Sequence, residues 1–193
     1  MNKNRLEAFS DGVIAIIITI MVLELKIPHG HQLENLFAVW PIFLGYVLSF
    51  LIVGTYWNNH HHLLHATRKI NGSVLWANLH FMFWLSLLPF ATDWMGESHF
   101  APEPTAVYAL ILCLCSVSHF LLQTSIIRQK DNRETLAQAL GSDLKGKLSL
   151  AGNVSAVPLA FMGYPHVAGV LMALVAALWL VPDQRIERRL SGD

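Results

Sequence analysis

Six long apolar runs constrain the fold of this chain more than any other feature of its sequence. They lie at residues 6–27, 36–59, 73–95, 105–127, 146–163 and 165–181. A helix crosses a bilayer with about 20 apolar residues, so 193 residues accommodate six crossings joined by short connections. Hydrophobic residues make up 54% of the chain and charged residues only 13%. The sequence therefore predicts an all-α integral membrane protein in which residues 1–193 form a single six-helix domain.

The basic residues indicate how such a protein is oriented. All but one of the 13 Lys and Arg residues flank the runs at ends that would share one side of the membrane, and Lys26 is the exception. These residues are Lys3, Arg5, Arg68, Lys69, Arg128, Lys130, Arg133, Lys145, Lys147, Arg185, Arg188 and Arg189. Because basic residues favour the cytoplasmic side, we expect a multi-pass protein of the cell membrane with both termini in the cytoplasm. The first run also resembles a signal peptide, but Glu-Leu-Lys-Ile-Pro at 24–28 replaces a small-residue cleavage site, so we expect no cleavage.

The first run differs from the others because charges lie close to both of its ends. Twelve uncharged residues separate Asp11 from Glu24, which is about 18 Å of helix against a hydrocarbon core of roughly 30 Å. The helix crosses only if it extends from about Leu6 to Ile27 and carries those charges with it. Charges at such depth normally face protein or water. We therefore expect this helix to be central in the protein and away from the lipid boundary.

A helical wheel divides the first run into two faces. At 100° per residue, Ile16, Ile20 and Leu23 share one face, and Thr19 flanks it. Ser10 and Asp11 lie on the opposite side, where they would contact neighbouring helices. An aliphatic stripe of this kind also serves ordinary packing against lipid or core, so the wheel alone assigns no function.

The residues around this stripe resemble a known family. Arg5-Leu6-Glu7-Ala8-Phe9-Ser10-Asp11-Gly12 looks like the opening signature of the transmembrane protein 175 family of lysosomal and bacterial potassium channels, which is an arginine, three residues and then Phe-Ser-Asp. Tyr-Trp-Asn-Asn-His-His at 56–61 resembles the end of the second helix of that family, and Leu-Ser-Leu-Leu-Pro-Phe at 85–90 resembles its third. The resemblance implies a bacterial, single-repeat member that forms a homotetramer, with the first helix of each chain lining a central pore. It also implies potassium as the permeant ion and no cofactor.

The resemblance assigns roles to individual residues of the first helix. The aliphatic position five after the motif aspartate is the narrowest point of the pore, which here is Ile16, and Ile20 and Leu23 continue the constriction. Thr19 is the hydroxyl position that coordinates the permeating ion in some members. The motif residues have a structural role, and they are Arg5, Phe9, Ser10 and Asp11. Candidate donors for the Asp11 carboxylate on other helices are Trp57, Asn58, His60, His61 and Trp76.

The sequence also indicates how such a pore would select ions. It contains no Thr-Val-Gly-Tyr-Gly segment, so a carbonyl filter is not expected. A ring of Ile16 side chains would form a hydrophobic gate that closes by dewetting. An oxygen on Thr19 would partly offset ion dehydration, which favours potassium over sodium. Glu24 would either concentrate cations at the outer mouth or pair with Lys26.

Two other functions use the same titratable residues. A proton-coupled membrane carrier is the main alternative, because Asp11, Glu24 and the ten histidines could relay protons. Paired Gly/Pro breaks in two halves would favour a carrier, and the chain has none that we detect. The histidines at 60–65 could also bind a metal, but we interpret this cluster as packing and hydrogen bonding or pH sensing.

Other classes have little support in the sequence. Cys113 and Cys115, two residues apart on one helix, would diverge and act as small apolar fillers. No nucleotide-binding loop, catalytic triad or cofactor motif is present, so we expect no enzyme. The basic and acidic residues balance, with 13 of each, which gives no reason to expect a nucleic-acid partner.

Overall fold

The computed structural model describes residues 3–67, 69–129 and 144–180, and in these ranges the regular structure is entirely helical. The expected all-α fold is therefore confirmed. Several basic residues used for the orientation lie outside the described residues: Arg68, Lys130, Arg133, Arg185, Arg188 and Arg189. The helices are α1 (Lys3–Leu23), α2 (Glu34–Ala38), α3 (Trp40–His65), α4 (Gly72–Ser86), α5 (Leu88–Glu97), α6 (Pro102–Ile127), α8 (Leu144–Phe161) and α9 (Pro165–Leu180).

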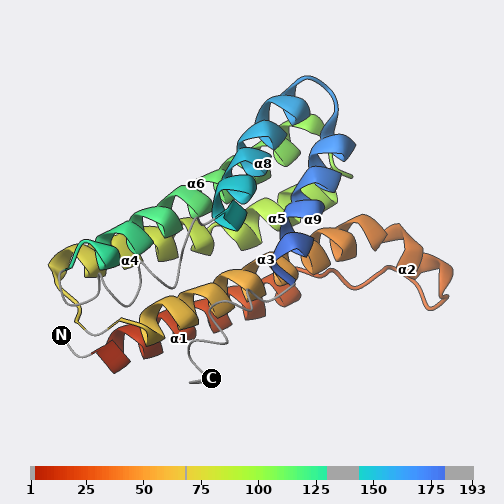
Figure 1. Cartoon of the computed structure of the whole chain (residues 1–193). Coiled ribbons are helices and arrows are strands. Elements are labelled where there is room, and N and C mark those ends of the chain that lie inside the picture. The colour runs from red at the N-terminus through yellow and green to blue at the C-terminus, as the bar shows by residue number, and fades with distance from the viewer. Residues whose placement is uncertain (1–2, 68, 130–143, 181–193) are drawn as a thin grey trace.

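Four helical stretches of the described chain are long and apolar enough to cross a membrane. They are Lys3–Leu23, Trp40–His65, Gly72–Glu97 and Pro102–Ile127, and each coincides with one of the first four apolar runs. Successive stretches along the chain are antiparallel to one another (Figure 1). Helices α8 and α9 occupy the fifth and sixth runs, but with 18 and 16 residues they are only about 27 Å and 24 Å long.

Three helix boundaries differ from those expected. α1 ends at Leu23, because Pro28 and the charged residues before it end the apolar helix, so α1 does not carry Glu24 and Lys26. The second run begins as the separate short helix α2, and α3 then extends to His65. The third run is divided between α4 and α5 at Leu87, because Pro89 in the first turn of α5 has no N–H to donate to the preceding turn.

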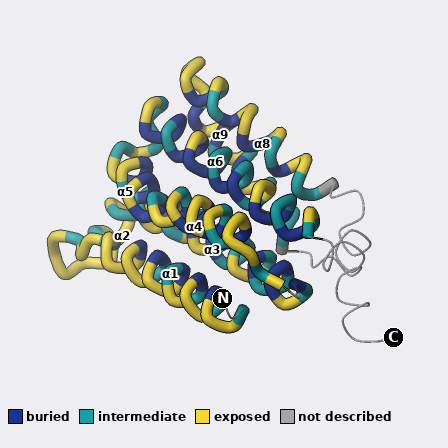
Figure 2. Tube along the Cα trace, turned by 90° about the vertical axis from the view of Figure 1, so that its left-hand side faces the viewer, coloured by how far each residue is buried: buried dark blue, intermediate teal, exposed yellow. Residues whose placement is uncertain are grey.

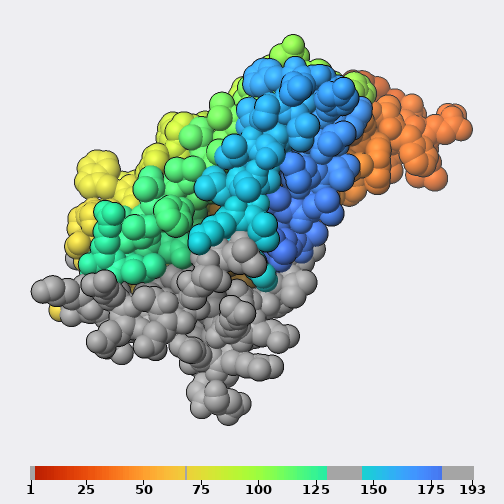
Figure 3. Space-filling model, turned by 45° about the horizontal axis from the view of Figure 1, so that its top comes forward, coloured from red at the N-terminus to blue at the C-terminus, as the bar shows by residue number. Residues whose placement is uncertain are grey.

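α6 is the centre of the packed bundle and contacts α4, α5, α8 and α9. Tyr108 and Leu112 of α6 are almost completely buried, as is Phe81 of α4. α8 and α9 lie side by side as a hairpin, which covers one face of the molecule (Figure 3). α3 and α5 approach closely at Gly96, where an added Cβ would lie 2.8 Å from the Cα of Ile42.

Hydrogen bonds between side chains join the long helices inside the bundle. The Ser49 hydroxyl of α3 lies 2.7 Å from the Thr92 hydroxyl and 2.8 Å from that of Tyr108. Farther along, the Ser116 hydroxyl of α6 lies 2.9 Å from the Tyr56 hydroxyl and accepts a hydrogen bond of 3.0 Å from Asn153 of α8. Such bonds hold helices together where lipid supplies no hydrophobic drive for their association.

α1 lies at the edge of the single chain, where it packs against α3, α4 and α5 (Figure 2). The expected central position is therefore not found within one copy of the protein. One side of the helix is buried and the other is exposed along its length.

Candidate functional site

The predicted pore-lining residues lie on the exposed side of α1. Ile16, Ile20 and Leu23 are 60%, 40% and 75% exposed. The opposite face is buried against the neighbouring helices, and it consists of Leu6, Ser10, Ile14, Ile17 and Met21. Ile17 is only 2% exposed, so two consecutive isoleucines occupy opposite environments. The exposed stripe is thus a set of large aliphatic side chains that the rest of this chain does not cover.

Thr19 lies on the same exposed side, and its hydroxyl is oriented by the helix. The Oγ1 atom donates a hydrogen bond of 2.9 Å to the carbonyl oxygen of Ala15, one turn earlier. Because the only hydroxyl proton is used in this bond, the lone pairs of Oγ1 are directed away from the backbone. A threonine in this state offers an oxygen acceptor, which is what a cation requires.

Ser10 of the Phe-Ser-Asp motif belongs to a buried network that joins three helices. Its hydroxyl donates to the carbonyl of Leu6 at 2.9 Å and accepts from the Asn78 amide of α4 at 3.0 Å. The Asn78 carbonyl oxygen in turn accepts from Nε2 of His60 on α3 at 2.7 Å. Ser10, Asn78 and His60 are all fully buried, so this network fixes the rotation of α1 against α3 and α4.

Asp11 and Glu7 connect α1 to α3 along a second line. Trp57, one of the five donors expected for Asp11, donates its indole N–H to the carboxylate at 3.0 Å. The Glu7 carboxylate lies 3.2 Å from Nδ1 of His61. Asp11 therefore points to a neighbouring helix and away from the exposed stripe.

The four motif residues do not act as one cluster. Ser10 and Asp11 face the bundle, whereas Arg5 and Phe9 are exposed on the opposite side of α1. At the other end of the helix, Glu24 is exposed, and Lys26 pairs with Glu97 at the end of α5. The alternative in which Glu24 pairs with Lys26 is thus replaced by an ion pair between separate segments.

Asn78 was not among the candidate residues predicted from the sequence. The feature that could have indicated it is its amide side chain in the middle of an apolar helix, where a polar side chain needs a partner. The partner is a serine 68 positions away.

The remaining candidate residues do not form a second site. Among the described residues, no group of three or more His, Cys, Asp or Glu side chains is arranged to hold a metal ion. His61 and His65 stack with ring centroids 6.0 Å apart, and His61 also stacks on Trp57. Cys113 and Cys115 are both free thiols.

Known proteins are similar to this chain in sequence and in fold. A family model described as "Endosomal/lysosomal potassium channel TMEM175" matches residues 5–89. A potassium channel of Chryseobacterium sp. (strain P1-3) is 50% identical over 191 residues, which is 99% of each chain. The chain belongs to the TMEM175 family. This TMEM175 member is accordingly a multi-pass membrane protein with several apolar helices.

More distant members extend the comparison. The endosomal/lysosomal proton channel TMEM175 of Gallus gallus is 30% identical over 152 residues, 70% of this chain and 30% of that protein. The crystal structure of a lysosomal potassium-selective channel TMEM175 homolog from Chamaesiphon minutus superposes with a TM-score of 0.76 at 23% identity, over 92% of this chain and 96% of that one. At this identity the likeness shows that the two proteins share a fold.

Proposed function

We propose that this protein is a potassium-selective cation channel in which α1 from each of four chains lines a central pore. The observation that carries the proposal is the exposed stripe of Ile16, Ile20 and Leu23, opposite a buried face on the same helix. Potassium as the ion is supported by two bacterial relatives that are named potassium channels and that match 99% and 86% of this chain.

The stripe favours an arrangement of several copies around α1. Half-buried charges lie near the cytoplasmic end of this helix at Glu7 and Asp11, and both are held by α3. A helix with such charges is costly at the lipid boundary. Copies arranged around the exposed face would remove α1 from lipid and place it at the centre, as the sequence leads us to expect. The number four comes from the family resemblance.

The chemistry of the stripe supports a hydrophobic gate. Ile16 is the most central of the exposed aliphatic residues, and rings of Ile20 and Leu23 would follow it toward the outer end. An aliphatic ring opposes ion entry because it offers no oxygen to replace lost hydration water. Thr19, between Ile16 and Ile20, offers its Oγ1 lone pairs to an ion at that level. Potassium loses its hydration shell more easily than sodium, so this arrangement favours potassium.

The proposed topology has six crossings, with both termini in the cytoplasm. Four stretches are long enough to cross without adjustment. α8 and α9 pack on the buried helix α6 and on each other, and local thinning of the bilayer accommodates their shorter length. Lys3, Lys145 and Lys147, at the first turns of α1 and α8, mark the cytoplasmic side.

Proton permeation is the second candidate function, favoured by the proton channel names of the vertebrate relatives. In this chain the titratable groups Glu7, Asp11 and His61 lie together where α1 meets α3. They lie off the stripe, so protons would need a route beside the aliphatic constriction.

Flux from liposomes that contain the purified protein separates these functions, provided that the number of subunits is measured on the same material. A potassium gradient without a pH gradient should drive potassium efflux from tetramers. Transport that requires a proton gradient would instead indicate the carrier. Proton flux that persists when potassium is replaced by an impermeant cation would establish proton permeation.

A further inference from the structure

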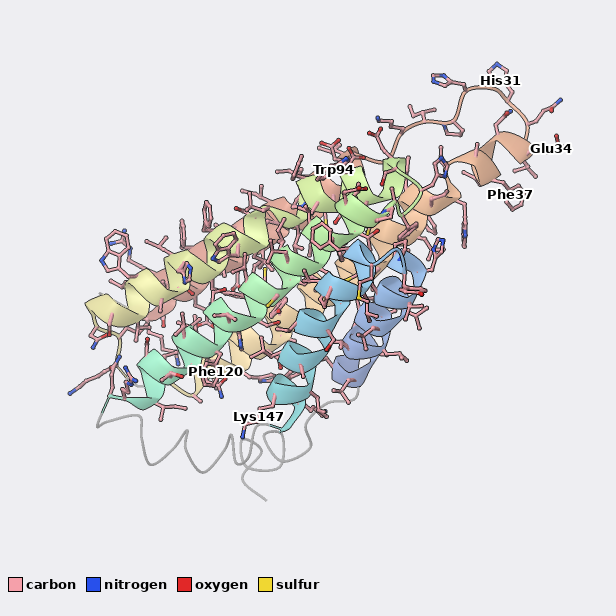
Figure 4. The ribbon with its side chains drawn as sticks, turned by 90° about the horizontal axis from the view of Figure 1, so that it is seen from above. His31, Glu34, Phe37, Trp94, Phe120 and Lys147 are labelled. Atoms are coloured by element: carbon pink, nitrogen blue, oxygen red, sulfur yellow. The ribbon has the colours of Figure 1, made fainter. Side chains whose placement is uncertain are left out.

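The connection between α1 and α3 projects away from the bundle. We call residues 24–40 the outer connection; it contains α2 and the first residue of α3, and among the described residues it extends farthest beyond the helix ends, with His31, Glu34 and Phe37 on it (Figure 4). The ion pair between Lys26 and Glu97 fixes its base to the end of α5. The outer connection is therefore attached to the bundle at its base, although little of it is packed against the other helices.

The outer connection has one apolar face. Leu33, Leu36, Phe37 and Trp40 follow each other at spacings of three, one and three residues, which places all four on one side of a helix. The backbone supports this geometry, because turn hydrogen bonds run from Asn35 to Gln32 and from Leu36 to Leu33. Leu33 is 81% and Phe37 76% exposed. Burial of such large apolar side chains away from water would be favourable.

The apolar face continues along a helix that crosses the membrane. On α3 the exposed residues Phe43, Val47 and Phe50 follow the same side, and aromatic rings form a row from Trp40 through Phe43 and Tyr46 to Phe50 with centroids 5.8–6.3 Å apart. Trp40 begins this row where α3 starts. Tryptophan is enriched at the boundary between hydrocarbon and headgroups, so a tryptophan at the start of α3 fits a position at interface depth.

We propose that the outer connection lies in the bilayer interface, with Leu33, Leu36, Phe37 and Trp40 inserted into lipid and Glu34 in the headgroup layer. An exposed apolar stripe opposite polar residues is the pattern of helices that lie flat in an interface. A second copy of the chain is a poorer match, because these four side chains, even together with Phe43, Val47 and Phe50, fall well short of the roughly 20–30 residues on each side of a stable protein interface. Anchored in this way, the connection holds the outer end of α1 at a fixed depth.

Spin labels on the two faces of α2 test this inference. In a background with Cys113→Ala and Cys115→Ala, Phe37→Cys and Glu34→Cys are labelled and the protein is placed in liposomes of phosphatidylcholine. We expect the label at 37 to collide more with oxygen, which dissolves in lipid, and the label at 34 to collide more with a water-soluble nickel chelate. Preference of both labels for nickel would overturn the proposal in favour of a solvated loop. An immobile label at 37 that neither reagent reaches would overturn it in favour of a second copy.

A variant that keeps both cysteines provides an independent test. Phe37→Trp should add fluorescence that lipids brominated near the top of the acyl chain quench more strongly than aqueous iodide does. The matched control is His31→Trp, at an exposed residue outside the apolar face, which should respond more to iodide. Stronger iodide quenching of the tryptophan at 37 than of that at 31 would contradict insertion.

Discussion

The indole nitrogen of Trp57 on α3 lies 3.0 Å from a carboxylate oxygen of Asp11 on α1, and this hydrogen bond forms on the side of α1 that faces away from Ile16. The motif aspartate thus holds the helix from behind while the aliphatic residues face outward. The carboxylate and the indole N–H form a hydrogen bond to a charged group, so removal of either partner should lower stability.

Asp11→Ala should reduce the yield of assembled protein more than it changes ion preference. The variant loses a hydrogen bond to a charged group, which contributes about 1.5–3 kcal/mol. Trp57→Phe keeps an aromatic ring, though a smaller one, and leaves the carboxylate without this donor, so it should lower stability as well. Size-exclusion profiles and thermal unfolding in detergent measure both effects. A normally assembled but unselective Asp11→Ala channel would place the carboxylate in the permeation path instead.

Asn78→Leu should destabilise the protein because it leaves Ser10 and His60 buried with one partner fewer each. Each unpaired buried group costs about 1–3 kcal/mol. Ser86→Ala, on the exposed side of the same helix, is the control and should have little effect. In a double-mutant cycle, Ser10→Ala should cost less in the Asn78→Leu background than alone, since the shared bond is already absent. Fully additive effects would show that the two residues are not coupled.

Ile16→Asn should widen and wet the proposed constriction, so that single-channel conductance rises several-fold and discrimination between potassium and sodium weakens. The matched control is Ile17→Asn at the next position, which is buried. A polar group buried there costs about 1–3 kcal/mol, so the variant should lose stability without a gain in conductance. If Ile16→Asn also only destabilises the protein, the stripe is a packing surface.

Thr19→Val should lower selectivity for potassium with a smaller change in conductance than Ile16→Asn produces. Valine has nearly the shape of threonine and keeps the width of the pore, but it removes the Oγ1 acceptor. Thr19→Ser retains the hydroxyl and should keep most of the selectivity. Reversal potentials under potassium and sodium gradients provide the measurement. Equal selectivity in all three proteins would exclude Thr19 as an ion ligand.

The topology predicts opposite accessibility for the two ends of the bundle. Cysteines introduced at Ser98 and at His31 should react with a membrane-impermeant maleimide from outside the cell. A cysteine at Ser73, an exposed residue at the start of α4, should react only after the membrane is permeabilised. The opposite pattern would invert the orientation derived from the basic residues.

The helical membrane fold, the approximate positions of the helices and the family could all be predicted from the sequence. These follow from local properties of the sequence. A run of about 20 apolar residues is long enough to cross a bilayer, and the residues of the Phe-Ser-Asp signature are contiguous. The two faces of α1 were also predictable, because a helix converts spacing along the chain directly into position on a face.

The contacts between residues of distant helices could not be predicted and became apparent only in the folded bundle. Ser10 bonds to Asn78 and Lys26 pairs with Glu97, although 68 and 71 positions separate them along the chain. The end of α1 at Leu23 and the division of the third run at Leu87 have local causes in proline and charge, but an apolar run alone does not show where these end the helix. Periodicity fixes the direction of a side chain about its own helix, but its partner depends on how the helices rotate and slide against one another, which the packing of the whole bundle determines.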